Sequence, residues 1–414
     1  MEKQNFIELE YTPQLHNVNI FLPSSKSESN RTLIINALSG NKSSLTNLSS
    51  ARDTQTMIRL LESDQEVLDV LDAGTTMRFL IAYLAVTNKN KILTGTKRMC
   101  ERPVSILVEA LKELGAVIEY QGKNGFPPVK ISGLKYQIKD HIRIKGDVSS
   151  QYISALLMIA PVLPLGLKLE LTGKVFSKPY IEMTLQLMKQ FGISYSWNDH
   201  IIELKPQNYK GISYEIESDW SGASYWFSMV ALAEKAHICL MGLREDSLQG
   251  DIRITSIMEK LGVKSLFKEN KVELTKIPHQ SEVEENFTDC PDLAQTVAVV
   301  CAIKGVTCKM TGLESLRIKE TDRILALQNE LQKLGAQLLE EDGKWTLIPS
   351  GTPIPANSNF SFNTYDDHRM AMAFAPLATQ ANVNIEHPQV VNKSYPSFWE
   401  DLKRAGINIK EEYQ

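Results

Sequence analysis

Positively charged residues stand where the sequence predicts that helices begin. Lys26 and Arg31 lie in a serine-rich segment ahead of an apolar helix, and Lys319 and Arg323, four residues apart, are expected on one face near the first turn of an amphipathic helix. A helix N-terminus favours anions, and a cation there costs about 0.3–1 kcal/mol. A bound phosphate or carboxylate would offset that cost, so the pattern favours an anion-binding site.

Other segments at predicted helix starts could also bind anions. Ala73-Gly74-Thr75-Thr76 offers backbone amides with little side-chain cover, and Ser149-Ser150 offers two adjacent hydroxyls where one suffices as a cap. A plain capped turn is the alternative for each. Six cations share such positions in a chain of net charge −4: Lys26, Arg31, Arg102, Lys319, Arg323 and Arg369. Together they indicate ligands that carry several phosphate and carboxylate groups.

The composition limits the class of protein. The 414 residues, 43% of them hydrophobic, suffice for two or more domains. The acidic balance argues against a nucleic-acid or anionic-membrane surface. Five cysteines without zinc-like spacing predict reduced thiols in a cytoplasmic protein. The longest apolar stretch, Ile153–Leu167, contains two prolines and is shorter than the roughly 20 residues of a membrane span.

An internal repeat indicates how these segments are positioned. Helical patterns end at glycines spaced by 77, 70, 73 and 71 residues, namely Gly115, Gly192, Gly262, Gly335 and Gly406. A second, nearly all-apolar type of helix, which belongs in a core, begins near Ser27, Asp72, Asp147, Asp219, Asp292 and Asp367. Short β-rich runs lie between them, including Val117–Tyr120, Leu167–Leu171, Ile201–Leu204, Lys271–Leu274 and Trp345–Ile348. We therefore predict a stacked or symmetric architecture.

The repeat predicts an α/β protein of six units, each with two helices and a few strands. Six units divide into two domains of three, with buried helices inside and sheet outside. We place one domain at residues 19–218 and the other, discontinuous domain at residues 1–18 plus 219–414. The strand Glu8–Tyr11 is expected to join the C-terminal half.

The motifs, in this order, resemble those of the 5-enolpyruvylshikimate-3-phosphate synthase family, from Pro23 to Pro396. They are Ser25-Lys26-Ser27 with Ser29-Asn30-Arg31, Ala73-Gly74-Thr75, Met77-Arg78, Glu101-Arg102-Pro103, Ser149-Ser150-Gln151-Tyr152, Ser177-Lys178-Pro179-Tyr180, Pro291-Asp292, Lys319-Glu320-Thr321-Asp322-Arg323 and Asp367-His368-Arg369-Met370-Ala371-Met372. The resemblance implies two inside-out α/β domains of three repeats each, with the active site in the cleft between them.

The resemblance also implies an activity. Enolpyruvyl would pass from phosphoenolpyruvate to the 5-hydroxyl of shikimate 3-phosphate by addition and elimination, a step of the shikimate pathway to aromatic amino acids. The implied catalytic residues are Asp292 as the base, Glu320 as the acid, and Lys26. Shikimate 3-phosphate would contact Ser27, Arg31, Ser149, Ser150, Gln151, Ser177, Tyr180, Asp292 and Lys319. Phosphoenolpyruvate would contact Lys26, Gly74, Arg102, Gln151, Arg323, His368, Arg369 and Lys393. No metal or organic cofactor is implied, and a monomer is expected.

Some residues depart from the family pattern. Ser24 stands in place of a glycine, Asp72 and Asp366 in place of asparagines, and Leu316 in place of a frequent aromatic residue. Asp72 adds a negative charge beside the expected phosphoenolpyruvate site, so it should weaken affinity unless a nearby cation pairs with it.

Other functions remain open at the level of sequence. The first is the sister enzyme that transfers enolpyruvyl to UDP-N-acetylglucosamine, but Cys100 lacks the glycines that surround that family's reactive cysteine. A non-catalytic anion-binding repeat protein would not need both Asp292 and Glu320. An RNA-terminal phosphate cyclase, which has related repeats, is disfavoured by the acidic net charge.

Overall fold

The chain crosses twice between two structural units. The computed structural model describes residues 5–413. Unit 1 contains the described residues up to Pro23 and those from Glu217 onward, and unit 2 contains Ser24–Ile216. The crossings thus lie at 23/24 and 216/217, whereas the sequence-based boundaries were at 18/19 and 218/219. The difference at the first crossing is β2 (Val18–Phe21), which pairs in parallel with β13 (His237–Met241) of unit 1.

Unit 2 contains two complete copies of one βαβαββ repeat. The first runs β4 (Val67–Asp69), α3 (Gly74–Thr87), β5 (Lys91–Thr94), α5 (Ser105–Leu114), β6 (Ala116–Tyr120) and β7 (Val129–Leu134), with the short helix α4 (Lys97–Cys100) inserted. The second runs β8 (His141–Lys145), α6 (Ser150–Ile159), β9 (Leu167–Thr172), α7 (Lys178–Gln190), β10 (Ser196–Asn198) and β11 (Ile201–Leu204). The sheet orders, β4-β5-β7-β6 and β8-β9-β11-β10, are equivalent. A third, smaller group consists of α1 (Lys26–Leu38), β3 (Ser44–Thr46), α2 (Arg52–Leu61) and β12 (Ser213–Glu215).

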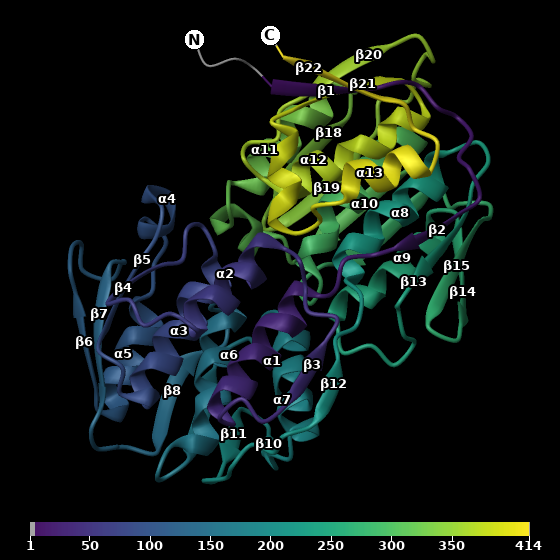
Figure 1. The fold of residues 1–414 in the computed structure, drawn as a ribbon. Helices are drawn as coiled ribbons and strands as arrows, with labels where there is room; N and C mark the ends of the chain where they lie inside the picture. Colours follow the sequence, from purple (N-terminus) through teal and green to yellow (C-terminus); the bar gives the residue numbers. More distant parts are fainter. Residues whose placement is uncertain (1–4, 414) are drawn as a thin grey trace. The chain divides into compact units, whose positions relative to one another are not determined.

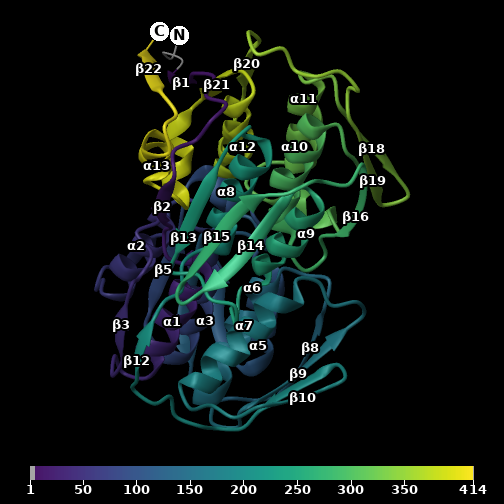
Figure 2. The same cartoon turned by 90° about the vertical axis from the view of Figure 1, so that its right-hand side faces the viewer.

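Unit 1 contains three four-stranded sheets among its described residues. One repeat runs β16 (Glu282–Asn286), α10 (Ala294–Lys304), β17 (Thr307–Thr311), α11 (Arg323–Gln332), β18 (Gln337–Glu341) and β19 (Lys344–Ile348). Another combines β2 with α8 (Trp220–Leu232), β13, α9 (Ile254–Lys260), β14 (Val263–Lys268) and β15 (Lys271–Lys276). In Figure 2, β13, β15 and β14 lie side by side in this sheet.

The third sheet of unit 1 is completed from far away in the sequence. It is formed by β20 (Asn359–Phe362), β21 (Asn382–Glu386) and β22 (Ile409–Tyr413), with α12 (His368–Phe374) and α13 (Phe398–Arg404) in the same repeat. Strand β1 (Asn5–Leu9) lies between β21 and β22 and is antiparallel to both. Figure 1 shows this purple strand among yellow ones.

Both types of helix predicted from the pattern are present. The apolar helices α3, α8 and α10 are buried on nearly every face, as expected for central helices. All five repeat glycines have a positive φ, from 73° at Gly335 to 110° at Gly115, and so end their helices in the left-handed conformation. The predicted mixed α/β architecture is confirmed. No helix among residues 5–413 is both long and apolar enough to span a membrane.

Candidate functional site

One buried guanidinium in unit 1 holds three carboxylates. Arg323 opens α11, and its side chain is 2% exposed. Its Nη1 donates to Asp292 Oδ1 at 3.0 Å, its Nη2 to Glu320 Oε2 at 2.8 Å, and its Nε to Asp367 Oδ2 at 2.6 Å. Burial alone would lower the pKa of Arg323, but Asp367, Glu320 and Asp292 together raise it. Such bonds to ionised groups are strong, so Arg323 fixes the two predicted catalytic carboxylates relative to each other.

Asp292 lies among three cations. Besides Arg323, Arg369 Nη2 donates to its Oδ2 at 2.9 Å, and Lys319 Nζ lies 3.8 Å from its Oδ1. Burial would raise the pKa of Asp292, but Arg369, Lys319 and Arg323 outweigh it and hold the pKa well below the usual range. Asp292 is therefore ionised at neutral pH, as a proton acceptor must be.

Glu320 is held between two cations. Its Oε2 accepts from Arg323, and Lys393 Nζ lies 3.4 Å from its Oε1. Lys393 is buried, with 7% of its side chain exposed. Lys393 belongs to the segment just before α13, so this ion pair ties that segment to the start of α11.

The prediction that Lys319 and Arg323 share a helical face is wrong. Helix α11 begins only at Arg323, because Asp322 caps it by accepting from the backbone N–H groups of Ile324 and Leu325. Lys319 lies ahead of the helix, with a backbone ψ of −150°. The two cations meet through Asp292 rather than along a helix.

The start of α12 supports the same cluster. Asp367 caps the helix by accepting from Arg369 N at 2.9 Å, and it also binds Arg323. His368 is 2% exposed, and its Nδ1 lies 3.7 Å from Asp367 Oδ1. The side chain of Arg369, whose burial next to apolar residues required a partner, is 10% exposed and pairs with Asp292.

A buried acid that the sequence did not single out lies behind Arg369. Asp251 accepts a hydrogen bond from the Ser221 hydroxyl, and Arg369 Nη2 donates to that hydroxyl at 3.4 Å. Burial, followed by the charge of Asp292, raises the pKa of Asp251 to about 7, while Arg369 and the Ser221 hydroxyl oppose the shift. Asp251 lies in a 3-10 turn, Gly250–Arg253, and no helix-start pattern marks it.

The Asp251→Asn variant should gain stability relative to the unchanged chain as pH rises. The folded pKa of about 7 exceeds the unfolded value of about 3.9. The unfolded chain therefore releases a proton that the folded chain retains, and stability falls between these pH values. The amide removes this loss, on the order of 1–4 kcal/mol. Calorimetric melting at pH 4.5 and pH 8 measures it, and an equal change in Tm at both pH values would contradict it.

In unit 2, the start of α1 carries two of the predicted site residues. Ser25 caps the helix by accepting from Glu28 N. Lys26 Nζ pairs with Asp53 Oδ2 at 3.2 Å, a partner that sequence reasoning missed. Ser27 is partly exposed, and its carbonyl accepts from Arg31 Nη1 at 2.8 Å.

Arg31 is directed into unit 2. It is 2% exposed, and its guanidinium donates to Thr184 Oγ1 at 2.7 Å and to Ser154 Oγ at 3.2 Å. Burial lowers its pKa to about 10, partly offset by Tyr180 and Glu28. The guanidinium carbon lies 5.8 Å from the centre of the Tyr180 ring. Arg31 thus positions two segments with predicted site residues, the start of α1 and that of α7.

The turn before α3 is built around a glycine. A Cβ at position 74 would lie 2.6 Å from Nη1 of both Arg102 and Arg78, closer than side-chain atoms tolerate. Arg78 also donates to the Gly74 carbonyl at 2.9 Å. No side chain caps α3 at Ala73. The missing Cβ at Gly74 thus leaves room for two guanidinium groups at a helix start, which is an arrangement suited to an anion.

The start of α6 contacts this turn. Ser149 is the N-cap and accepts from Gln151 N at 3.4 Å, which leaves Ser150 as the first helical residue. Gln151 Nε2 donates to Thr75 Oγ1 at 3.0 Å. Ser177 precedes α7 in the left-handed conformation, with φ of 53°. Unit 2 thus brings Gln151 to the Gly74 turn.

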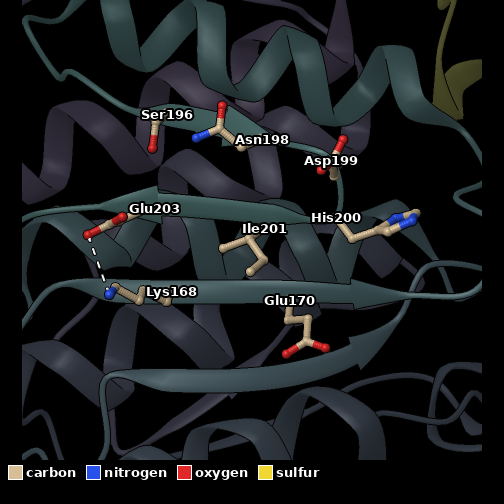
Figure 3. A pocket seen from close by; sticks show the side chains of 8 residues that line it. All are labelled: Lys168, Glu170, Ser196, Asn198, Asp199, His200, Ile201 and Glu203. Carbon is tan, nitrogen blue, oxygen red and sulfur yellow. Dashed lines mark ion pairs between the residues drawn. The ribbon is translucent and has the colours of Figure 1, made fainter.

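A surface cavity in unit 2 does not coincide with these residues. It has a volume of about 500 Å³ and lies over the β8-β9-β11-β10 sheet (Figure 3). It is lined by Lys168, Glu170, Ser196, Asn198, Asp199, His200, Ile201 and Glu203. Lys168 Nζ lies 3.8 Å from Glu203 Oε1 across neighbouring strands. None of its lining residues belongs to the predicted site.

Comparisons with known proteins agree with the motifs. The sequence model of EPSP synthase (3-phosphoshikimate 1-carboxyvinyltransferase) matches residues 59–402. A 3-phosphoshikimate 1-carboxyvinyltransferase of Bacteroides fragilis (strain YCH46) is 51% identical over 94% of this chain and 96% of that protein. The protein of that name from Idiomarina loihiensis is 36% identical over 93% and 95%. A solved EPSP synthase from Acinetobacter baumannii, 19% identical, has a TM-score of 0.78 over 99% of this chain and 100% of that one, which supports the fold. This chain therefore belongs to the EPSP synthase family.

Proposed function

We propose that this chain transfers the enolpyruvyl group of phosphoenolpyruvate to the 5-hydroxyl of shikimate 3-phosphate and releases phosphate. The observation that carries the proposal is the Arg323 cluster. In it, one buried guanidinium binds two carboxylates, the proposed base and the proposed acid, beside Lys319, Arg369 and Lys393. Family membership and the 51% identical relative give the same activity.

Asp292 is proposed to take the proton from the 5-hydroxyl as its oxygen attacks C2 of phosphoenolpyruvate. Its ionised form is secured by three cations, but the same cations weaken it as a base. Anionic substrates that attract Arg369 and Lys319 would reduce the stabilisation of the Asp292 charge by these two cations. The carboxylate would thus become more basic when the substrates are in place.

Glu320 is proposed to protonate the methylene carbon, which becomes a methyl group and completes a tetrahedral ketal phosphate. Loss of phosphate, with removal of a methyl proton, then gives the enol ether. Arg323 and Lys393 pair with Glu320 and stabilise its negative charge. Substrate anions that attract these two cations would favour the protonated form that the addition step needs.

The remaining residues are proposed to bind the two anionic substrates. In unit 2, Lys26, Gly74 and Arg102 would hold phosphoenolpyruvate, while Ser149 and Ser150 would hold shikimate 3-phosphate. Because acid, base and anion-binding groups must act on the same substrate pair, we infer that catalysis needs residues of both units. Fixed cations bind the substrates and position them for reaction. Action as a monomer in the cytoplasm stays a prediction from the sequence.

Phosphate release tests the function directly. With phosphoenolpyruvate present, release should require shikimate 3-phosphate and should not occur with UDP-N-acetylglucosamine as the only acceptor. The enol ether should form in equal amount to the phosphate, as measured by mass spectrometry. Release with the nucleotide sugar alone would assign the sister activity, and no release with either acceptor would contradict enolpyruvyl transfer.

A further inference from the structure

Two neighbouring residues at the start of α2 pair with two different parts of the proposed phosphoenolpyruvate site. Nη2 of Arg52 donates to both carboxylate oxygens of Asp72, at 2.9 and 2.8 Å. The next residue, Asp53, pairs with Lys26. The Asp53 carbonyl also accepts from the Thr76 hydroxyl at 3.1 Å. The first turn of α2 therefore contacts both the Lys26 segment and the turn that contains Gly74.

Asp72 carries a charge that opposes anion binding at this turn. It lies two residues before Gly74, so the two Cα atoms are at most about 7 Å apart. The helix start at Gly74 and the guanidinium of Arg102 would otherwise present positive potential to a phosphate or carboxylate. A carboxylate carried by a residue so near in the chain lowers this potential.

We propose that Arg52 offsets the charge of Asp72 and thereby sets the affinity of the Gly74 turn for phosphoenolpyruvate. This inference rests on the proposed function. Arg52 acts through Asp72 and not by contact with the substrate, so it is an affinity-determining residue and not a catalytic one. Asp72, which departs from the family pattern, was expected to weaken affinity unless a cation paired with it. Arg52 is such a cation.

The exposure of the pair favours an electrostatic role over a structural one. The side chains of Arg52 and Asp72 are 51% and 31% exposed. Exposed ion pairs of this kind contribute little to stability. Their charges still act on a ligand that lies within the screening length, which is about 8 Å at physiological ionic strength. Arg52→Ala should therefore lower substrate affinity and leave the melting temperature almost unchanged.

The test uses charge variants of the full chain. The measured quantity is KM for phosphoenolpyruvate at saturating shikimate 3-phosphate, from phosphate release. Arg52→Ala should raise KM by about 3–10-fold at low ionic strength, because one negative charge at the turn is no longer offset. Asp72→Asn should leave KM equal or lower it, and Arg52→Ala/Asp72→Asn should return KM to within about twofold of the unchanged chain. The value of kcat should stay within about twofold throughout.

Matched variants separate charge from shape. Arg52→Lys keeps the charge but loses the two-pronged contact, so KM should stay near that of the unchanged chain. Arg143→Ala removes an arginine that is 71% exposed and paired with Glu170 in the same unit, and KM should not change. The rise in KM of Arg52→Ala should shrink at about 0.5 M salt, where screening is stronger.

The outcomes are distinguishable. If Arg52→Ala and Asp72→Asn both raise KM and the double variant does not restore it, the pair serves to hold the turn in place and the inference is overturned. An unchanged KM in Arg52→Ala overturns it as well. If the unchanged chain releases no phosphate with shikimate 3-phosphate, the proposed function fails, and this inference fails with it.

Discussion

Glu320→Gln should lower kcat by about 10²–10⁴-fold while KM for phosphoenolpyruvate changes by less than about threefold. The amide keeps the shape of the side chain and an oxygen that can accept from Arg323, which donates to Glu320 at 2.8 Å. It has no acidic proton for the methylene carbon, so the loss should fall on the chemical step. Steady-state kinetics with both substrates varied separates kcat from KM.

A neighbouring glutamate serves as the control for this substitution. Glu314 lies in the 3-10 turn Glu314–Ile318 and is exposed, so Glu314→Gln should leave both constants unchanged. Equal losses in kcat and in substrate affinity for Glu320→Gln would show that Glu320 binds substrate and does not act as the acid. Unchanged kinetics would remove it from the mechanism.

Arg323→Met should destabilise unit 1 by about 3–5 kcal/mol and abolish measurable turnover. The substitution removes the guanidinium that binds Asp292, Glu320 and Asp367, and Asp367 is fully buried. Charges left in a buried site without this partner are costly. Chemical denaturation followed by fluorescence and circular dichroism measures the change in the free energy of unfolding.

The loss in the free energy of unfolding caused by Arg323→Met, called the deficit below, should grow as pH rises. In the unchanged chain the folded pKa of Asp292 is lowered, so its stabilising contribution is present at neutral pH and is lost as pH falls below about 4 towards that folded pKa. Without Arg323 part of this contribution is lost, so the deficit should be smaller at pH 3 than at pH 7.

Arg317→Met is the matched control for Arg323→Met. The side chain of Arg317 is 40% exposed and pairs with Asp322 and Glu340 at the surface, so its loss should cost less than about 1 kcal/mol. Equal deficits for the two variants, or a deficit of Arg323→Met that does not change with pH, would show that the buried ion pairs do not carry the stability assigned to them.

The sequence predicted the repeated elements well because their signals are local. A helix that ends at Gly115 or Gly406 carries its own stop signal, and a strand such as Ile201–Leu204 is bounded by turn residues. The domain boundary predicted between residues 18 and 19 divides the strand Val18–Phe21. That strand pairs with His237–Met241, and nothing local to it identifies the partner.

The ion pairs of the candidate site were largely beyond sequence reasoning. Residue types and helix starts pointed to Arg323 and Asp292, but their pairing depends on how separate segments pack. The shared helical face of Lys319 and Arg323 was wrong because the Asp322 cap delays the helix. The partners Arg52 and Asp72 are 20 residues apart and belong to different helix starts, and Asp251 carries no motif at all.

The position of β1 determines when unit 1 can be completed during protein synthesis. Residues close to β1 find their partners far along the chain, as when Tyr11 N donates to Asn382 Oδ1 across 371 residues. At about 5–20 residues per second, the ribosome needs roughly 20–70 s to make that interval. Unit 2 is continuous and can fold within that time, while β1 and β2 cannot pair until their partner strands in unit 1 have been made. Nascent chains should therefore resist protease in residues 24–216 before they do so in residues 5–23.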